Sequence, residues 1–437
     1  MRIGIIGAGI IGVTTAYELA TDGHEVTVYE RNAHVASESS FANAGVVAPG
    51  YVTPWAAPGM PAKVLRDMFG SHSAVRFSGT GALAHLPWIW RWWRACQPAV
   101  HQANRSQMHS LAKYSIQRLH ELTKGLQLDY ERATGYLVLL RGERERALAE
   151  TTMRTLRELE VPFDLLDAHQ CRLLEPGLSA ETALLAAIGL PRDEVANCRQ
   201  FAQLLKGEAQ RNGARFLLCH EVVSLSPGPQ PRVWAREVAG AANGSVRTHD
   251  ALQADAAVSA FDAVVVCAGA QANALLRPIG CKLPLLSVHG YSITAPLQHR
   301  DGLPPQAPLG GLMDERYKVA VSRLGQRVRV AGSAEIGGAA DRFNPAALAT
   351  LYKVLNDWFP GVARLTQAQP WKGARPMLPD GPPVLGRSGA PGIWLNLGHG
   401  ASGWALSCGS ARALADLMAQ RETAIDISGL GRDRLKT

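Results

Sequence analysis

The sequence lacks the features that mark several large classes of protein. Its 437 residues contain no run of about 18 apolar residues, so no membrane-spanning helix is expected. The seven cysteines form no C-x-x-C pair, and no His/Cys cluster has zinc-ligand spacing, so we expect no metal site. An odd, scattered set of cysteines is typical of a reducing compartment. With no export signal recognised at the start, a cytoplasmic location is expected.

Blocks of consecutive Lys and Arg are also absent, which disfavours a nucleic-acid-binding protein. The formal net charge is nevertheless +8, and the basic residues are spread along the whole chain. Such a balance favours anionic partners, such as carboxylate substrates, phosphates or an acidic membrane surface. The 47% hydrophobic and 19% charged residues are ordinary for a globular protein of two or three domains.

The chain does contain a nucleotide-binding motif at its very start. A strand is predicted over 2–6, followed by a turn that holds Gly7, Gly9 and Gly12, a helix, and a second strand over 25–29. The first glycine allows a tight turn, the second lets the backbone approach a pyrophosphate, and the third lets the helix pack on the strand. The N-terminus of the helix then faces the phosphates with free N–H groups.

Glu30 follows the second strand and indicates which dinucleotides the chain could bind. A carboxylate about 20 residues beyond the glycines accepts hydrogen bonds from the adenosine ribose and disfavours a 2′-phosphate, so NADP is not expected. NAD and FAD remain. The position of the motif at the start of a long chain, with no second glycine hexad, favours FAD.

Periodicity along the chain predicts an α/β fold with a discontinuous cofactor domain. Segments typical of nucleotide-domain strands occur at the start, the middle and the end, and the pieces between them have antiparallel character. We therefore expect a Rossmann-like FAD-binding domain with an inserted mixed-sheet substrate domain. The expected cofactor domain comprises 1–55, 190–280 and 328–437, and the substrate domain comprises 56–189 and 281–327. Helices are predicted over 87–125, 142–160, 201–212 and 403–420; strands over 136–140, 215–219, 263–267, 291–294, 317–322, 328–332 and 392–397; and hairpins over 227–258.

Four segments resemble those of the FAD-dependent D-amino-acid oxidase-like superfamily. The glycine motif with Glu30 is shared with many flavoproteins, whereas the other three are more particular. They are 39–45 with 49–51 and 54–59; 373–377 with 379–383; and 398–400 with 403–404. The resemblance therefore spans nearly the whole chain.

The resemblance implies the oxidation of a D-amino acid by FAD. A hydride would pass from the substrate Cα to flavin N5, water would hydrolyse the imine to a 2-oxo acid and ammonia, and a quinone or other acceptor would take the electrons. Arg375 would clamp the substrate carboxylate, because a guanidinium matches a carboxylate with two parallel hydrogen bonds. Tyr291 and Tyr317 would offer hydroxyls to the substrate. His399 and His289 are candidate bases, and His399 could instead simply orient the flavin edge.

We assign a set of residues, most of them small, to the binding of the cofactor. Non-covalent FAD is implied, because Met377 and Leu378 stand beyond the arginine motif where related covalent flavoenzymes carry a cysteine. The glycine turn over 398–403 ends a predicted strand and opens a helix, whose positive end would face the flavin. The assigned residues are Gly7, Gly9, Ile10, Ile11, Gly12, Glu30, Arg31, Ser39, Ser40, Asn43, Ala44, Gly45, Val222, Val223, Ala268, Gly269, Gly398, Gly400, Gly403 and Trp404.

Other activities remain open on the same pattern. A glycine/sarcosine-type or secondary-amine oxidase and a 2-hydroxy-acid dehydrogenase are alternatives on the same fold. A non-catalytic flavoprotein redox subunit that needs a partner is an alternative from a different class.

The segment 86–94 packs four tryptophans and two arginines into nine residues. Tryptophan and arginine favour the lipid headgroup boundary. One hypothesis is that Trp88 to Trp93 dock the protein on the inner membrane of a bacterium as a peripheral protein. The alternative is that these tryptophans fill the core of the substrate domain or close its cleft.

Overall fold

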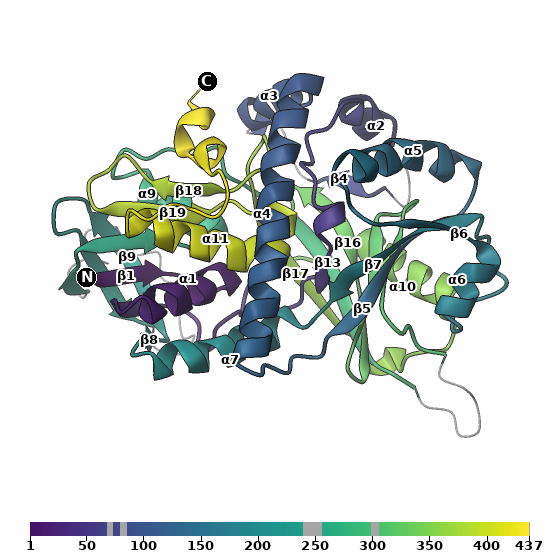
Figure 1. Cartoon of the computed structure of the whole chain (residues 1–437), viewed down its shortest axis with the longest axis horizontal. Coiled ribbons are helices and arrows are strands. Elements are labelled where there is room, and N and C mark those ends of the chain that lie inside the picture. The colour runs from purple at the N-terminus through teal and green to yellow at the C-terminus, as the bar shows by residue number, and fades with distance from the viewer. Residues whose placement is uncertain (68–72, 79–84, 239–255, 299–305, 437) are drawn as a thin grey trace.

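The computed structural model describes residues 1–67, 73–78, 85–238, 256–298 and 306–436 (Figure 1). Two large sheets dominate it, and the long helix α4 (Pro98–Gly125) crosses the molecule between them. Part of the predicted hairpin region, 239–255, lies outside the described residues. Within the described ranges, no helix has both the length and the apolar character needed to cross a bilayer.

A six-stranded sheet carries the glycine motif and has the order β18-β19-β12-β1-β2-β8. Its strands pair in parallel except for β18, which is an antiparallel edge. Four of the five β1 residues are buried, as expected for a parallel sheet covered on both faces. The strands are β1 (Arg2–Ile6), β2 (Glu25–Tyr29), β8 (Arg215–Leu217), β12 (Ala263–Val266), β18 (Val384–Arg387) and β19 (Ile393–Leu397).

Alternate residues of these strands enter two different cores. Val265 of β12 packs with helices α1 (Ile10–Thr21), α7 (Cys198–Arg211) and α11 (Gly403–Met418) on one face. Val264 and Val266 pack on the other face, because successive side chains of a strand point in opposite directions. That second face is covered by α9 (Ala272–Leu276) and by a small sheet of β9 (His220–Ser226), β10 (Arg232–Glu237) and β11 (Ala257–Ala260).

The ten-stranded sheet is mixed and has the order β17-β13-β16-β15-β14-β5-β7-β3, with β4 on β16 and β6 on β7. Helix α10 (Pro345–Trp358) packs on this sheet and forms one hydrophobic core with it. Helix α5 (Glu143–Glu158) forms a second hydrophobic core with β5 and β7. The strands are β3 (Val46–Val47), β4 (Val75–Phe77), β5 (Ala133–Leu140), β6 (Asp164–Asp167), β7 (Ala186–Val195), β13 (Leu286–Pro296), β14 (Gly311–Asp314), β15 (Val319–Leu324), β16 (Arg327–Ile336) and β17 (Gln369–Met377). The remaining α-helices of the described ranges are α2 (Met60–Asp67), α3 (Leu86–Ala95) and α6 (Ala168–Leu174).

The strand pairing differs from the expected division of the chain at several points. Strand β3 and the end of β7, expected in the cofactor domain, lie in the ten-stranded sheet, and the largest difference concerns β16 and β17. The sequence predicts that all of 328–437 belongs to the cofactor domain, yet β16 and β17 pair with the two edges of β13 in the ten-stranded sheet. The apolar pattern of β16 does not distinguish a parallel nucleotide-domain strand from a buried antiparallel one. The domain boundaries stay a prediction, and the pairing favours a return to the cofactor domain only after β17.

Two local predictions are corrected by the structure. The helix expected over 87–125 is two helices, because Pro98 begins α4 and its ring cannot continue the preceding helix α3. Tyr317, expected in a strand, lies in the turn between β14 and β15. There its N–H donates to the Asp314 carboxylate at 3.1 Å, and the strand begins only at Val319.

Candidate functional site

The glycine turn between β1 and α1 leaves the backbone open on one side. Gly7 has a φ of +96°, and a Cβ at Gly12 would stand 1.8 Å from the Gly7 carbonyl oxygen. A Cβ at Gly9 would meet nothing nearer than the Ser40 hydroxyl oxygen, at 3.5 Å. The Ile10 N–H donates to that hydroxyl at 3.1 Å. The start of α1 therefore faces open space in front of Gly9, as a phosphate site requires.

A smaller cavity of about 350 Å³ lies beside this turn, at the end of β2. The Glu30 carboxylate at its edge is buried and fixed, because it accepts the N–H groups of Ala8 at 2.8 Å and Asn32 at 2.9 Å. A fixed carboxylate beside apolar side chains suits an adenosine. The predicted cofactor residues that line it are Gly7, Gly9, Glu30, Arg31, Ser39, Ser40, Val222, Val223, Ala268 and Gly269.

A larger cavity of about 880 Å³ continues from the smaller one towards the ten-stranded sheet. The two cavities share Gly9, Ser39, Ser40 and Gly269 in their walls, so one elongated ligand can reach both. Of the predicted cofactor residues, Gly12 alone lines neither cavity, because its role is to pack α1 against the turn. The predicted residues in the larger cavity are Gly9, Ile10, Ile11, Ser39, Ser40, Asn43, Ala44, Gly45, Gly269, Gly398, Gly400, Gly403 and Trp404.

Among the buried polar atoms in the wall of the larger cavity that lack a partner in the described part of the chain, two lie on either side of the glycine turn over 398–403. They are the carbonyl oxygen Oδ1 of Asn396, in β19, and the indole nitrogen Nε1 of Trp404, in α11. The Asn396 amide nitrogen donates a hydrogen bond to the Thr15 hydroxyl at 2.9 Å, so the side chain has a defined orientation. An unpaired hydrogen-bond acceptor and an unpaired donor fit a ligand that has both donors and acceptors, such as the ring system of FAD.

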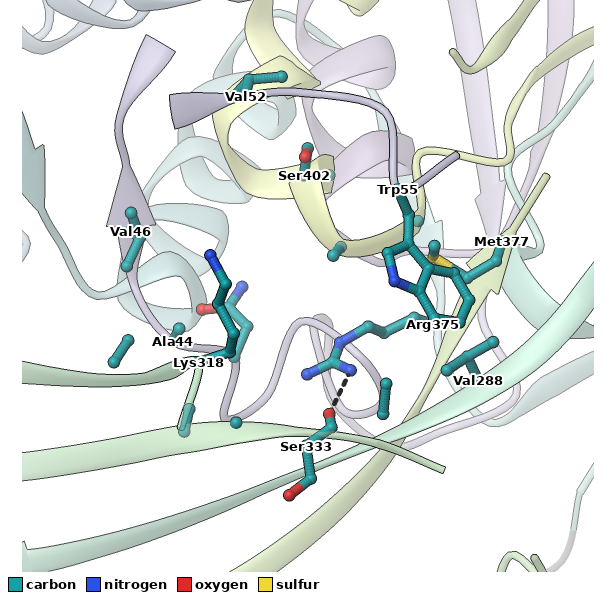
Figure 2. Close-up of a pocket in the computed structure, with 18 of the residues that line it drawn as sticks. Ala44, Val46, Val52, Trp55, Val288, Lys318, Ser333, Arg375, Met377 and Ser402 are labelled. Atoms are coloured by element: carbon teal, nitrogen blue, oxygen red, sulfur yellow. Dashed lines mark hydrogen bonds between the residues drawn. The ribbon is translucent and has the colours of Figure 1, made fainter. Parts of the chain in front are cut away.

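Arg375, in β17, extends into the larger cavity (Figure 2). Its Nη1 donates to the Ser333 carbonyl oxygen at 2.7 Å, and Trp55 and Met377 lie beside it. Among the described residues, no carboxylate pairs with this guanidinium. Burial lowers the pKa of Arg375 to about 10, because a cation out of water is destabilised. The site therefore favours an anionic ligand at this point.

Tyr291, in β13, lines the same cavity, but its hydroxyl is already engaged. It donates to the Glu335 carboxylate and accepts the Asn344 N–H at 3.3 Å. Burial and the neighbouring Glu335 raise the pKa of Tyr291, so the hydroxyl keeps its proton. Lys372 completes this network through an ion pair with Glu335 at 2.9 Å.

Tyr317 is turned towards cations of the protein itself. Arg141 lies 5.1 Å and Lys353 5.7 Å from the centre of its ring. Its neighbour Lys318 is the residue of this turn that Figure 2 shows across the cavity from Arg375. Lys318 forms an ion pair with Glu315 and donates to the Tyr51 hydroxyl at 3.2 Å.

His399 lies between β19 and α11, with its Nε2 2.9 Å from the Ser410 hydroxyl. Burial lowers the pKa of His399 to about 3, so the ring is neutral at physiological pH. Since the Ser410 hydroxyl donates to the Leu406 carbonyl, we infer that Nε2 carries the proton. His289 lies outside the walls of both cavities, and burial lowers its pKa as well.

Six of the seven cysteines are buried, and Cys219 is partly exposed. Cys267 is the cysteine in the cavity walls, and its thiol faces Thr15 at the nucleotide end. Burial raises the pKa of Cys267 to about 12, which disfavours the reactive thiolate. No group of His, Cys, Asp or Glu in the described ranges could hold a metal ion.

Several cavity residues were not predicted from the sequence. Ser333 lies inside a strand and contributes its carbonyl, for which no residue type is diagnostic. Lys318 follows Tyr317 in a turn that contains no glycine or proline, so the sequence gives no turn signal there. Asn396 could have been noticed as an amide within an otherwise apolar strand.

Comparisons with known proteins agree with this geometry. The family model described as FAD dependent oxidoreductase (DAO) matches residues 2–417. The chain is 42% identical to a D-amino acid dehydrogenase of Cereibacter sphaeroides, over 99% of this chain and 95% of the relative. It is 39% identical to one of Rhizorhabdus wittichii, over 99% of this chain and 100% of the relative.

Solved structures share the fold at lower identity. Glycine oxidase of Geobacillus kaustophilus is 20% identical with a TM-score of 0.71, over 98% of each chain. L-proline dehydrogenase of P. horikoshii is 18% identical with a TM-score of 0.70, over 99% of this chain and 97% of that chain. At this level of identity the likeness concerns the fold alone.

The burial of neutral His399 predicts a specific dependence of stability on pH. Below about pH 6.5 the unfolded chain binds a proton that the folded chain takes up only near its own pKa, about 3. The free energy of unfolding should therefore fall by up to about 1.4 kcal/mol per pH unit through this residue. His399→Gln cannot titrate, so wild type should lose about 2 kcal/mol more than the variant between pH 7 and pH 5 in urea unfolding. The exposed His34→Gln serves as the control and should follow wild type. Equal losses in wild type and His399→Gln would contradict the neutral buried ring.

Proposed function

The chain belongs to the DAO family of FAD-dependent oxidoreductases, and we propose that it oxidises D-amino acids to 2-oxo acids and ammonia. The observation that carries the proposal is the Arg375 guanidinium, which meets the larger cavity without a carboxylate partner in the described residues. An amino acid brings a carboxylate for this cation and a Cα–H bond that a flavin can oxidise. The relatives named D-amino acid dehydrogenase support the D configuration.

FAD would extend through both cavities without a covalent bond. Glu30 would accept hydrogen bonds from the ribose, Val222 and Val223 would flank the adenine, and the amides at the start of α1 would meet the pyrophosphate. The unpaired polar atoms of Asn396 and Trp404 would face the ring system from the larger cavity. None of the seven cysteines lies beside Arg375, which supports non-covalent attachment.

FAD, when bound, accepts the hydride that leaves the substrate Cα. The chain itself binds and orients the substrate, since Arg375 has N–H groups to spare for a two-point contact with the carboxylate. Trp55 and Met377 lie beside this cation and reduce its contact with water, which strengthens the pairing. Correct placement of Cα then supplies a large share of the rate.

No base of the protein is required for this reaction. The His399 ring is engaged through Nε2 with Ser410, and the Tyr291 hydroxyl donates to Glu335. We therefore expect the substrate amine to lose its proton to water as it binds. The neutral amine then assists the departure of the hydride, and water hydrolyses the imine that results.

The function is tested by anaerobic reduction of the bound flavin. D-Alanine should bleach the yellow protein and yield pyruvate and ammonia, whereas L-alanine should leave the colour unchanged. Sarcosine and D-lactate test the amine-oxidase and 2-hydroxy-acid alternatives, because both molecules can also place a carboxylate on Arg375. Faster bleaching by either one would replace the proposed substrate. A flavin that none of the four reduces would favour a non-catalytic redox subunit.

Loss of Arg375 should cripple turnover without loss of the flavin. Arg375→Ala should lower kcat/KM by the equivalent of about 2–5 kcal/mol, since a desolvated charge-assisted pair is lost. Arg375→Lys should recover little, because an ammonium cannot form the planar two-point contact. FAD released by acid gives the cofactor content, and the exposed Arg211→Ala is the matched control. Near-normal kcat/KM in Arg375→Ala at full FAD content would exclude the clamp.

We also propose that electrons pass to a quinone at a membrane surface and that α3 docks there. The structure assigns its four tryptophans to two environments. Trp88 and Trp92 are buried, with ring centres 6.2 Å and 5.6 Å from that of Trp55. Trp90 and Trp93 are 57% and 51% exposed and stack on each other at 5.2 Å. An exposed aromatic pair on an arginine-bearing helix supports interfacial binding, and the buried pair belongs to the core.

Membrane docking is tested with the exposed pair. Wild type should float with liposomes that contain anionic lipid at low salt, and Trp90→Ser/Trp93→Ser should not. Leu173→Ser/Leu174→Ser, which removes exposed apolar side chains from α6, is the control and should float like wild type. All three proteins should turn over a soluble electron acceptor equally. Flotation of the tryptophan variant at the wild-type level would reject α3 as the docking site.

A further inference from the structure

The pairing between β13 and β16 changes register beside Arg375. His289 pairs with Glu335, but Tyr291 pairs with Gly332, so Gly290 on β13 faces both Ser333 and Ala334 on β16. The extra residue forms a β-bulge. Ser333 in this bulge has a φ of +60°, a conformation that residues other than glycine seldom adopt within a strand.

The bulge turns a backbone carbonyl towards the guanidinium. The Ser333 oxygen accepts Nη1 of Arg375 at 2.7 Å, and Figure 2 shows this bond, with the serine hydroxyl turned away from the guanidinium. A neutral carbonyl fixes the cation without neutralising it, whereas a carboxylate here would compete with an anionic ligand. In the described residues no acceptor is recorded for Nε or Nη2, and neither atom is sealed from the cavity. The edge formed by these two atoms is thus open for a carboxylate.

Strand β13, which pairs with β17, leaves space for the Arg375 guanidinium. Gly290 has no side chain, and a Cβ there would stand 2.2 Å from Nη2, 2.4 Å from Cζ and 2.9 Å from Nε of Arg375. Real Cβ atoms do not approach other atoms so closely, so any side chain at this position would displace the guanidinium. Arg375 therefore lies flat against bare backbone on β13 and is bonded to a bulge on β16.

We propose that Gly290 and the Ser333 carbonyl are positioning elements that set the carboxylate-binding edge of Arg375. The proposal rests on the proposed role of Arg375 as the substrate clamp. Neither element touches the substrate in this scheme. Each acts through the position of the guanidinium, so its effect must vanish when the guanidinium is absent.

The test is a double-mutant cycle on the FAD-loaded protein. Benzoate, a carboxylate with no Cα–H bond to oxidise, is titrated and its Kd is taken from the change in flavin absorption. Gly290→Ala should raise this Kd by about tenfold, the scale of one charge-assisted hydrogen bond. It should also lower kcat/KM for a D-amino acid on the order of 100-fold, because small displacements of a clamp are costly. Gly207→Ala in α7, where a Cβ meets nothing within 4 Å, is the matched control.

The decisive comparison is made in the Arg375→Ala background. There Gly290→Ala should change the Kd of benzoate by no more than about threefold, since the atoms that a Cβ would strike are gone. An equal loss in both backgrounds would show a general structural defect and overturn the proposal, as would wild-type affinity in Gly290→Ala alone. If Arg375→Ala itself binds benzoate like wild type, the clamp and the proposed function are wrong, which is a separate result.

A second pair of variants tests the carbonyl of Ser333. Ser333→Gly keeps the carbonyl and tolerates a positive φ, whereas the branched side chain of Ser333→Val opposes that conformation. The valine variant should therefore lose more benzoate affinity than the glycine variant, at equal FAD content. Equal affinity in the two variants would overturn the role of the bulge.

Discussion

A half-buried cation with no counter-ion among the described residues, Arg375, organises the proposed substrate side of this molecule. Burial of an unpaired charge costs several kcal/mol in a typical interior, so such a group persists only where the fold holds it firmly or a ligand neutralises it. The Arg375 guanidinium donates one hydrogen bond to a backbone carbonyl, that of Ser333, and its other N–H groups face the cavity. The neighbouring cation Lys372, in contrast, is already paired with Glu335. A few residues apart on one strand, the protein therefore has a lysine in an ion pair and an arginine that we propose binds an anionic ligand.

The two ends of the candidate site are built by different means. At the nucleotide end, backbone groups of the β1–α1 turn and the fixed carboxylate of Glu30 lie within the first thirty or so residues. At the substrate end, Arg375 depends on β13, β16 and β17, which are brought together only by the ten-stranded sheet. The glycine turn and Glu30 are thus local in sequence, whereas the proposed substrate site is a product of long-range strand pairing.

This difference explains how much of the molecule could be predicted from the sequence. The glycine turn and Glu30 could be predicted because each residue has a local conformational or chemical reason to be there. Arg375 was found through a family resemblance, and the strand that carries it was missed. Tyr317 is expected in a strand because an aromatic residue stands close before the apolar residues of β15, while the turn has no glycine or proline. A bulge such as that at Ser333 leaves no trace in residue type, because its geometry is set by the partner strands. The prediction treats the four tryptophans of 86–94 alike, as either a docking surface or a core. Successive residues of a helix point in different directions, however, so two of the tryptophans are buried and two are exposed.

The distribution of thiols has a practical consequence. Cys219 is the one cysteine that is not buried, and it directly precedes β9, whose Val222 and Val223 line the smaller cavity. The other six thiols are shielded by the interior, and burial raises the pKa of each of them, so they react slowly with alkylating reagents. A maleimide dye added to the unaltered, folded protein should therefore attach at a single position. That fluorophore would stand next to the predicted adenosine site and report on its occupancy, without any cysteine having to be removed first.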